Sequence, residues 1–323
     1  MEWSGKRVLV TGGAGFLGAN LCHALAARGA KVTALDGFLF GGGANPANLD
    51  GADVTLVTAD IREVDLRNLC EGRDVIFNLA AQTSHMGGQR DPLADIAVNA
   101  VAQVRLIQAA REAAPEAVVV HASTRQFYGT PDYLPVDERH PVRPPDANGV
   151  SKFAGEQYWM IEHRTVGRPV VSLRLTNCYG PRLRIRDARQ TFLGIWLRCV
   201  LEGRGFEVWG GEQLRDMTYV DDVTEAFLRA ASTPGCYGQV YNIGGPPPAS
   251  LREIAEITCR VAGPGAQFIT REFPADRKSI DIGSYHADDS AFRNATGWSA
   301  RIGLEDGIRL SLDWYRSRLA AYL

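Results

Sequence analysis

Residues 7–18 decide the fold and read Arg7-Val8-Leu9-Val10-Thr11-Gly12-Gly13-Ala14-Gly15-Phe16-Leu17-Gly18. An apolar run ends in glycines, and a helical pattern follows in which Leu21 and Leu25 are four residues apart. A strand that turns into a helix through glycines leaves backbone N–H groups at a positive helix end, which is a cradle for an anion. Glycine is needed because a Cβ would block the phosphate or the helix–strand contact. The stretch predicts a pyrophosphate site.

Asp36 supports a dinucleotide. It ends a second predicted strand, 31–35, about 20 residues beyond the glycine turn, where a carboxylate can accept both ribose hydroxyls. A 2′-phosphate would be repelled there, so the sequence favours NAD over NADP.

Strand and helix patterns alternate up to about residue 177, which predicts an α/β fold with a doubly wound parallel (Rossmann) sheet. The expected division is a dinucleotide-binding domain at 1–177 and a smaller C-terminal α/β substrate lobe at 178–323, parts of which return to the sheet. Ligands bind outside the carboxyl ends of such strands. The predicted cofactor contacts at those ends are Gly12, Gly15, Phe16, Leu17, Gly18, Asp36, Asp60, Ile61, Leu79, Ala80 and Ala81.

The bulk composition excludes several classes of function. The net charge of −2 gives no attraction to nucleic acid or an anionic membrane. The six cysteines have no metal-ligand spacing, so we expect free thiols and no metal site. No apolar run approaches about 20 residues and the chain enters its first strand at once, so we expect a cytoplasmic protein.

With its motifs assembled, the chain resembles the extended short-chain dehydrogenases/reductases of the nucleotide-sugar epimerase/dehydratase family. The resemblance covers nearly the whole chain. It rests on the 11–18 turn and on Asp60-Ile61, Asn78-Leu-Ala-Ala-Gln82, Ser123-Thr-Arg-Gln-Phe-Tyr-Gly129, Ser151-Lys152, Arg174-Leu-Thr-Asn-Cys-Tyr-Gly-Pro181, Arg215-Asp-Met-Thr-Tyr-Val-Asp-Asp222 and Gly297-Trp298. It implies a tightly held NAD, a nucleotide-diphosphate sugar as substrate, and transient oxidation of a sugar carbon to a ketone.

The resemblance also exposes one departure. In this family a tyrosine four residues before a lysine removes the hydroxyl proton, and the lysine holds the nicotinamide ribose. Lys152 is present, but Asn148 stands at the tyrosine position. An amide has no proton chemistry near neutral pH, so the usual base is missing.

Three interpretations of this departure remain open. Another group takes the tyrosine's role, or Asn148 binds the hydroxyl while protons pass through water, or the protein is a pseudoenzyme that binds NAD and a nucleotide sugar without turnover. The candidates for the replacement base are Thr124, Tyr128, His85, Cys178, Tyr179, Asp146 and Lys152 itself.

The resemblance assigns further site residues. Thr124 would bond the reacting oxygen, and Arg125 and Gln126 replace acidic residues that dehydratases use, which speaks against loss of water. Asn99 would lie near the cofactor. The expected substrate contacts are Thr124, Arg125, Asn177 and the two diphosphate-binding arginines Arg215 and Arg277.

The sequence thus predicts an NAD-dependent nucleotide-diphosphate-sugar epimerase that acts at C4 through a keto intermediate, with Thr124, Lys152, Asn148 and His85 as candidate catalytic residues. The alternatives are a nucleotide-sugar dehydrogenase or reductase and the pseudoenzyme. The long helices expected at 92–114 and 149–166 form a dimer interface in this family, so we also expect a homodimer.

Overall fold

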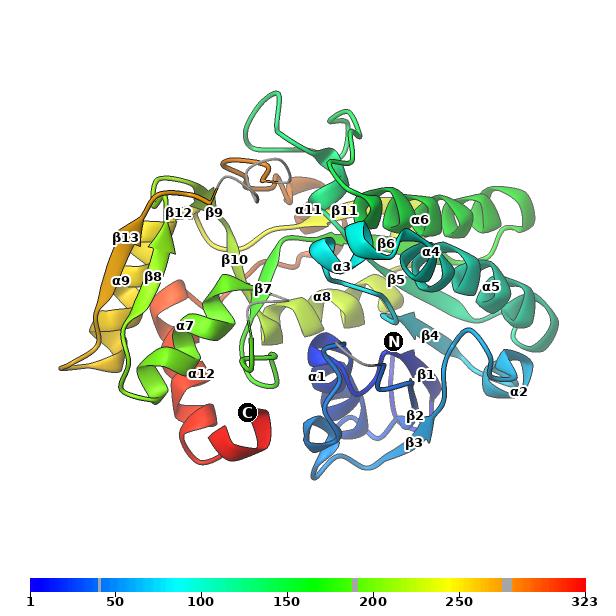
Figure 1. The fold of residues 1–323 in the computed structure, drawn as a ribbon. Coiled ribbons are helices and arrows are strands. Elements are labelled where there is room, and N and C mark those ends of the chain that lie inside the picture. Colours follow the sequence, from blue (N-terminus) through cyan, green and yellow to red (C-terminus); the bar gives the residue numbers. More distant parts are fainter. Residues whose placement is uncertain (40–41, 188–190, 275–280) are drawn as a thin grey trace.

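A seven-stranded parallel sheet forms the centre of the computed structural model, which describes residues 1–39, 42–187, 191–274 and 281–323 (Figure 1). The strand order is β11-β6-β5-β4-β1-β2-β3. The strands are β1 (Arg7–Thr11), β2 (Lys31–Asp36), β3 (Val54–Thr58), β4 (Val75–Asn78), β5 (Val118–Thr124), β6 (Val170–Leu175) and β11 (Gln239–Ile243). This arrangement confirms the predicted doubly wound sheet.

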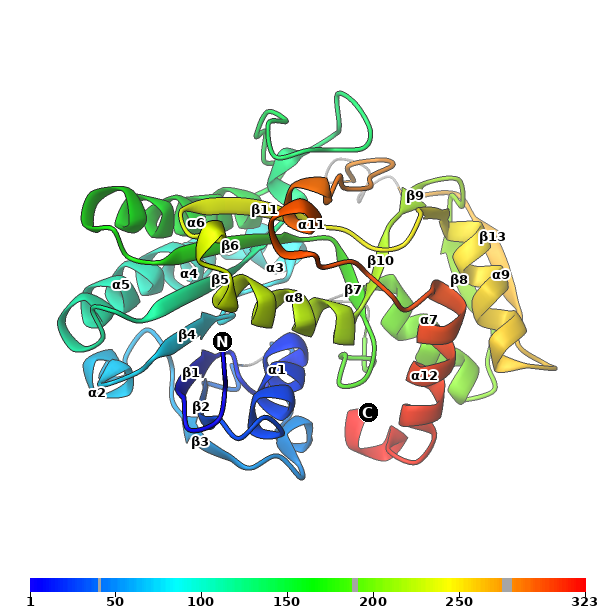
Figure 2. The same ribbon diagram turned by 180° about the vertical axis from the view of Figure 1, so that it is seen from behind.

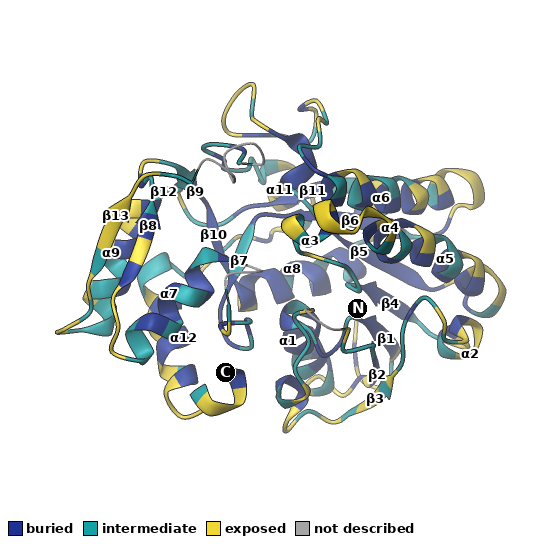
Figure 3. Cartoon of the chain, in the orientation of Figure 1, coloured by how far each residue is buried: buried dark blue, intermediate teal, exposed yellow. Residues whose placement is uncertain are grey.

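Helices cover both faces of the sheet because successive side chains of a strand point to opposite sides. Val8 and Val10 pack with helices α1 (Phe16–Ala26), α8 (Val220–Ser232) and α11 (Ser290–Thr296). Leu9 packs on the other face, with α2 (Leu66–Cys70), α5 (Ala102–Ala113) and α6 (Ala147–Val166). Figures 1 and 2, seen from opposite sides, show these two helical layers, and Figure 3 shows the buried strands between them.

The chain changes direction in the sheet between β1 and β4. From β1 it runs outward through β2 to β3, then returns to pair β4 with the other side of β1 and continues through β5 to β6. Ligands of doubly wound sheets bind outside the strand ends at such a switch point. Gly12 follows β1 there, and Leu79 follows β4.

A second layer of structure stands beyond the carboxyl ends of the sheet, around its own apolar cluster. Its elements are β7 (Asn177–Tyr179), α7 (Phe192–Leu201), β8 (Phe206–Trp209), β9 (Leu214–Arg215), β10 (Met217–Tyr219), β12 (Ala249–Ser250), α9 (Leu251–Ala262), β13 (Phe268–Arg271) and α12 (Leu304–Arg316). The three small sheets pair β10 with β7, β12 with β9 and β13 with β8. Between these elements the chain returns once to the central sheet, because β11 pairs with β6.

The long helix expected at 92–114 is made of three segments. These are α4 (Pro92–Ile96), a π-helical turn at Ala97–Val101 and α5. A short helix, α3 (His85–Arg90), precedes them and packs against α6. Within the described ranges no helix is both long and apolar enough to cross a membrane.

Candidate active site

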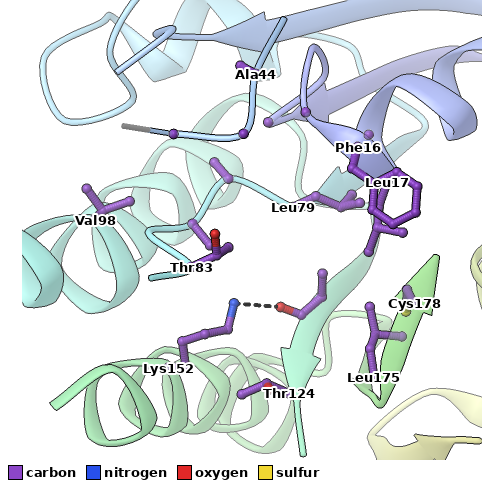
Figure 4. Close-up of a pocket in the computed structure, with 18 of the residues that line it drawn as sticks. Phe16, Leu17, Ala44, Leu79, Thr83, Val98, Thr124, Lys152, Leu175 and Cys178 are labelled. Atoms are coloured by element: carbon purple, nitrogen blue, oxygen red, sulfur yellow. Dashed lines mark hydrogen bonds between the residues drawn. The ribbon is translucent and has the colours of Figure 1, made fainter. Parts of the chain in front are cut away.

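A cavity of about 330 Å³ lies at the switch point, outside the carboxyl ends of β1, β4 and β5 (Figure 4). It extends from the glycine turn and Asp36 at one end to Arg125 and Cys178 at the other. The predicted site residues that line it are Gly12, Gly15, Phe16, Leu17, Gly18, Asp36, Asp60, Ile61, Leu79, Ala80, Ala81, His85, Thr124, Arg125, Asn148, Lys152 and Asn177.

The glycine turn is built for close approach of a ligand. Gly12 has a φ of +69°, and a Cβ there would lie 2.9 Å from the backbone nitrogen of Ala80. A Cβ on Gly18 would lie 2.1 Å from the carbonyl oxygen of Gly12, so only glycine permits this strand–helix contact. Helix α1 begins after Gly15 without a side-chain cap, which leaves its first N–H groups available for an anion.

Asp36 is fixed at the cavity wall by backbone donors. Its Oδ2 accepts from the nitrogen of Ala14 at 3.1 Å and its Oδ1 from that of Phe38 at 3.0 Å. Burial raises the pKa of this carboxyl, and the backbone N–H groups around it oppose that rise. Each oxygen retains a lone pair for a ribose hydroxyl, so the glycine turn and Asp36 together fit the adenosine diphosphate half of NAD.

Lys152 and Thr124 face the middle of the cavity (Figure 4). The Lys152 Nζ donates to the carbonyl of Ala122 at 3.3 Å, and burial lowers the pKa of this lysine to about 8. Thr124 ends β5, and its Oγ1 accepts from the nitrogen of Gln126 at 3.2 Å. The hydroxyl proton of Thr124 is therefore available for a ligand oxygen.

The amide nitrogen of Asn148 is engaged by the protein itself. Its Nδ2 donates to the carbonyl of Gln82 at 2.8 Å and to Asp95 Oδ2 at 3.0 Å. Asn99 donates to the other oxygen of the buried Asp95, at 3.0 Å. Both amide hydrogens of Asn148 are thus committed to the protein, which argues against its donating to a sugar hydroxyl.

His85 lies at the first position of α3. Ser84 caps this helix by accepting from the nitrogen of Gly87 at 3.1 Å. The His85 Nδ1 lies 2.9 Å from Oδ2 of Asp146, whose side chain is fully buried. The two side chains are in contact at this distance, but the ring N–H is not aimed straight at the oxygen.

Around Arg125, which lines the cavity, several polar atoms have no partner within the described residues. Arg125 donates through Nη2 to Asn177 Oδ1 at 2.9 Å, while its buried Nη1 has no acceptor. Its guanidinium stacks over Tyr285, 4.8 Å from the ring centre, and burial lowers the pKa of this arginine. The hydroxyls of Ser123 and Tyr285 and Oδ1 of Asp216 are also buried without partners.

Three predicted site residues are not among those that line the cavity. Asn99 lies behind the wall, where it bonds both backbone groups of Gln82 at 3.0 Å. Arg215 is buried and donates to the carbonyl of Leu214 at 2.8 Å and to Asp281 at 3.3 Å. Those carbonyl and carboxylate partners already occupy its guanidinium. Arg277 lies outside the described residues.

The other candidate bases differ in access. Tyr128 is fully buried, donates to Asn242 Oδ1 at 2.9 Å and has its pKa raised to about 12 by burial. Tyr179 is equally buried and its pKa is raised by burial. Cys178 lines the cavity, but burial raises its pKa to about 12, so it is a neutral thiol.

Sequence reasoning missed Thr191 and the pairing of His85 with Asp146. Thr191 lines the cavity from the start of α7, with its hydroxyl buried and unpartnered among the described residues. No local pattern marks it. Asp146 carried a signal, since an Asp before a helix is an N-cap.

Comparison with known proteins adds to this geometry. A sequence model described as "NAD dependent epimerase/dehydratase family" matches residues 8–244. A UDP-glucose 4-epimerase of Mycolicibacterium smegmatis is 34% identical over 317 residues, covering 97% of this chain and 99% of that protein. A dTDP-glucose 4,6-dehydratase of Streptomyces niveus is 32% identical, covering 97% of this chain and 94% of that protein.

Among solved structures, nucleotide-sugar epimerases also resemble this chain. A UDP-N-acetylglucosamine 4-epimerase from Methanobrevibacter ruminantium, in complex with UDP-N-acetylmuramic acid, has a TM-score of 0.89 at 26% identity and covers 98% of this chain and 99% of its own. A UDP-glucuronic acid 4-epimerase from Bacillus cereus, in complex with NAD, has a TM-score of 0.81 at 28% identity, covering 95% and 96%.

Proposed function

Because the chain belongs to the NAD-dependent epimerase/dehydratase family, we propose that it epimerises a nucleotide-diphosphate sugar, at C4 of the sugar, through a transient ketone. The observation that carries the proposal is one continuous cavity, lined at one end by the glycine turn and Asp36 and in its middle by Lys152 and Thr124. The glycine turn, Asp36 and Lys152 would hold NAD, which would supply reversible hydride transfer at the sugar carbon.

The chain's own residues have distinct parts in this proposal. The turn at Gly12 and Gly18 holds the pyrophosphate, and Asp36 holds the adenosine ribose. Lys152 holds the nicotinamide ribose, and its positive charge beside the cavity stabilises negative charge on a reacting oxygen. Thr124 donates a hydrogen bond to the sugar oxygen that reacts.

The substrate end of the cavity supports an anionic sugar nucleotide. Arg125 and Asn177 are held together by the 2.9 Å hydrogen bond, and the free Nη1 of Arg125 offers a charge-assisted donor. We assign Arg125 and Asn177 to the sugar. Arg277 is kept as a candidate for the diphosphate, together with Arg215, which would first have to release its carbonyl and carboxylate partners.

Epimerisation is favoured over loss of water, although dehydratases stand among the relatives. A dehydratase needs acid and base groups for the carbons beside the ketone. At the two positions after Thr124 the chain has Arg125 and Gln126, and the Gln126 amide is already engaged with Asp146 at 3.3 Å. Neither side chain exchanges protons near neutral pH.

The test incubates purified protein with UDP-, GDP-, CDP- and dTDP-sugars in deuterated water and follows the products by NMR. Formation of a C4 epimer without net NADH supports the proposal. Net NADH would indicate a dehydrogenase, and a 4-keto-6-deoxy sugar a dehydratase. Binding without conversion would indicate the pseudoenzyme.

A homodimer and a cytoplasmic location are part of the same proposal. The helical layer of α4, the π-turn and α6 exposes large apolar side chains, namely Leu93, Ile96, Val101, Val150, Tyr158 and Ile161. Leu93 is 80% exposed, which is costly for a monomer and suits a helix-to-helix interface. All six cysteines are free, as in a reducing compartment.

Light scattering coupled to size exclusion tests the dimer. We expect a mass near twice that of one chain, and a monomer for Leu93→Glu combined with Val150→Glu. The matched control places glutamate at Leu310, which is 46% exposed on α12. If wild-type protein at 50 μM has the mass of a single chain by light scattering, the proposed dimer is wrong.

A further inference from the structure

We infer that His85, oriented by Asp146, is the proton acceptor that replaces the absent tyrosine. The inference rests on the proposed function and names the group that completes it. It is carried by the position of His85 on the cavity wall and by its 2.9 Å contact with a fully buried carboxylate.

Asp146 is held by groups from three parts of the chain. Its Oδ1 accepts from the nitrogen of Gly149 at 2.7 Å and so caps α6, and its Oδ2 accepts from Gln126 Nε2 at 3.3 Å. His85 from α3 is the third partner. Burial acts to raise the pKa of Asp146, but His85, the Gly149 N–H and Gln126 together outweigh it and lower the pKa of this carboxyl.

The carboxylate sets the orientation of the imidazole. A proton on Nδ1 that faces Asp146 leaves Nε2 as an acceptor, which is the arrangement that a general base requires. The His85 side chain is 36% exposed, so the ring reaches the cavity while its partner is buried. The imperfect alignment of the N–H is common in ligand-free sites and improves when substrate binds.

The dyad is linked to the reacting centre through Gln126. The Gln126 side chain contacts Asp146, and its backbone nitrogen donates to Thr124 Oγ1 at 3.2 Å. The first turn of α6, which carries Asn148, lies against α3, because a Cβ on Gly88 would lie 3.3 Å from that of Asn148. Asn148, the position at which the family has its tyrosine, therefore lies beside Gly88, one turn of α3 from His85.

Competing acceptors on the described wall are weaker. Cys178 keeps its proton, and Asn148 has no proton to exchange. Lys152 has a lowered pKa of about 8, but it is protonated at neutral pH and its charge is needed at the ribose. An imidazole is the ordinary acceptor near pH 7.

In the proposed step the sugar loses a proton from its hydroxyl oxygen and a hydride from the same carbon. The sugar O–H bond breaks, its proton forms a bond with Nε2 of His85, and the oxygen's electron pair becomes the second bond of the ketone. The hydride of the same carbon passes to bound NAD, so the sugar is oxidised and the cofactor reduced by two electrons. In the return step His85 gives the proton back to the oxygen.

The experiment compares wild type with His85→Gln and Asp146→Asn, using UDP-glucose, UDP-N-acetylglucosamine, UDP-glucuronic acid and dTDP-glucose as probes. We expect His85→Gln to lower kcat by about 100- to 10,000-fold, the usual contribution of a general base, with KM and NAD content nearly unchanged. The matched control is His23→Gln, because His23 bonds the Asn48 carbonyl and is not among the residues that line the cavity.

Asp146→Asn tests the positioning residue, since asparagine also caps a helix. We expect a fall of at least about tenfold in kcat, as for loss of an orienting carboxylate. Imidazole 15N NMR on histidine-labelled protein supplies a readout beyond turnover. In wild type the His85 signal shows the proton on Nδ1 and shifts on addition of the converted probe, and in Asp146→Asn the proton is shared between both nitrogens.

Two outcomes separate this inference from the proposed function. If wild type converts a probe and folded His85→Gln does so at the same kcat, the inference fails and the function stands. If wild type holds NAD and binds a probe without converting it, both fail, because a working base and cofactor would oxidise the bound sugar. Should His85→Gln not fold, Asp146→Asn with wild-type kcat and an unchanged Nδ1 proton would overturn the inference alone.

Discussion

The two ends of the cavity differ in how far the protein satisfies its own polar groups. At the cofactor end, Asp36 is held by two backbone donors. The glycines there let the turn at Gly12 pack directly against the backbone of Ala80 and of Gly18. At the substrate end, Arg125 and Ser123 each leave a buried polar atom without a partner among the described residues, as do Asp216 and Tyr285, which do not line the cavity.

Binding at the cofactor end therefore depends mainly on shape, whereas binding at the substrate end depends mainly on polar and charged groups. The cofactor end depends on the absence of Cβ atoms, which lets the backbone of the glycine turn approach a ligand closely. The substrate end depends on polar atoms whose burial is costly until a ligand bonds them. Substitutions at the first should therefore abolish binding outright, and those at the second should change affinity and stability in graded steps.

The largest effect is expected at the glycine turn. Gly18→Ala places a Cβ 2.1 Å from the Gly12 carbonyl, which forces strand and helix apart and removes NAD binding. Co-purified NAD, measured after denaturation, should fall below detection. The control is Gly235→Ala, where a Cβ meets nothing within 4 Å. Normal NAD content in Gly18→Ala would break the contrast between the two ends.

The second largest effect is expected for Lys152→Met. Burial already disfavours the ammonium, as its lowered pKa shows, so a neutral side chain of similar length should leave the fold intact. The loss of positive charge at the ribose and at the reacting oxygen should lower kcat by about 100-fold or more. Steady-state kinetics check this against Lys6→Met, a half-exposed partner of Asp74. Equal kcat values would remove Lys152 from the chemistry.

Arg125→Gln sharpens the description of the substrate end. Loss of one charge-assisted hydrogen bond corresponds to about 1.5–3 kcal/mol, or a rise in KM of about 10- to 150-fold. NAD content should not change, because Arg125 lies at the other end of the cavity. Arg229→Gln, on α8 and paired with Glu225, is the control. A lower NAD content with unchanged KM would contradict the assignment.

The smallest effect is expected for Asp216→Asn, in the free energy of unfolding. Burial raises its pKa to about 6 from an ordinary value of 3.8, so the folded state binds more protons than the unfolded state between those values. Its contribution to stability is therefore present below about pH 4 and is lost as the pH rises through 6. Asp216→Asn should be more stable than wild type above pH 6, by about 1–3 kcal/mol, and equal near pH 4.

Thermal unfolding from pH 4 to 8 measures this difference. The Asn side chain can still accept from the nitrogen of Ala287, which Asp216 bonds at 3.0 Å. A stability difference that does not vary with pH would show that the Asp216 carboxyl is not the titrating group.

The sequence predicted the cofactor end better than the substrate end, and the reason is locality. Gly12, Gly18 and Asp36 act through one turn and two adjacent strands, so their spacing along the chain carries the information. Arg125 meets Asn177 and Tyr285 from distant segments, and Arg215 turned out to be occupied by the Gly283 carbonyl and Asp281. Such partners depend on tertiary packing, which spacing does not reveal.

The missing tyrosine shows the same limit. The motif revealed that Asn148 cannot exchange a proton, but not that its amide faces Gln82 and Asp95. It also gave no sign that a helix at 85–90 would bring His85 to Asp146, 61 residues away along the chain.

The return of β11 to the central sheet has a consequence for dissecting this protein. β11 covers the hydrogen-bonding edge of β6, a strand whose six residues are all buried, while α8 covers one face of the same sheet. A fragment ending at residue 177 would present that strand as a bare apolar edge, a template for aggregation. A crossover between relatives at residue 177 would separate β6 from β11 and α8, so both segments should come from the same parent.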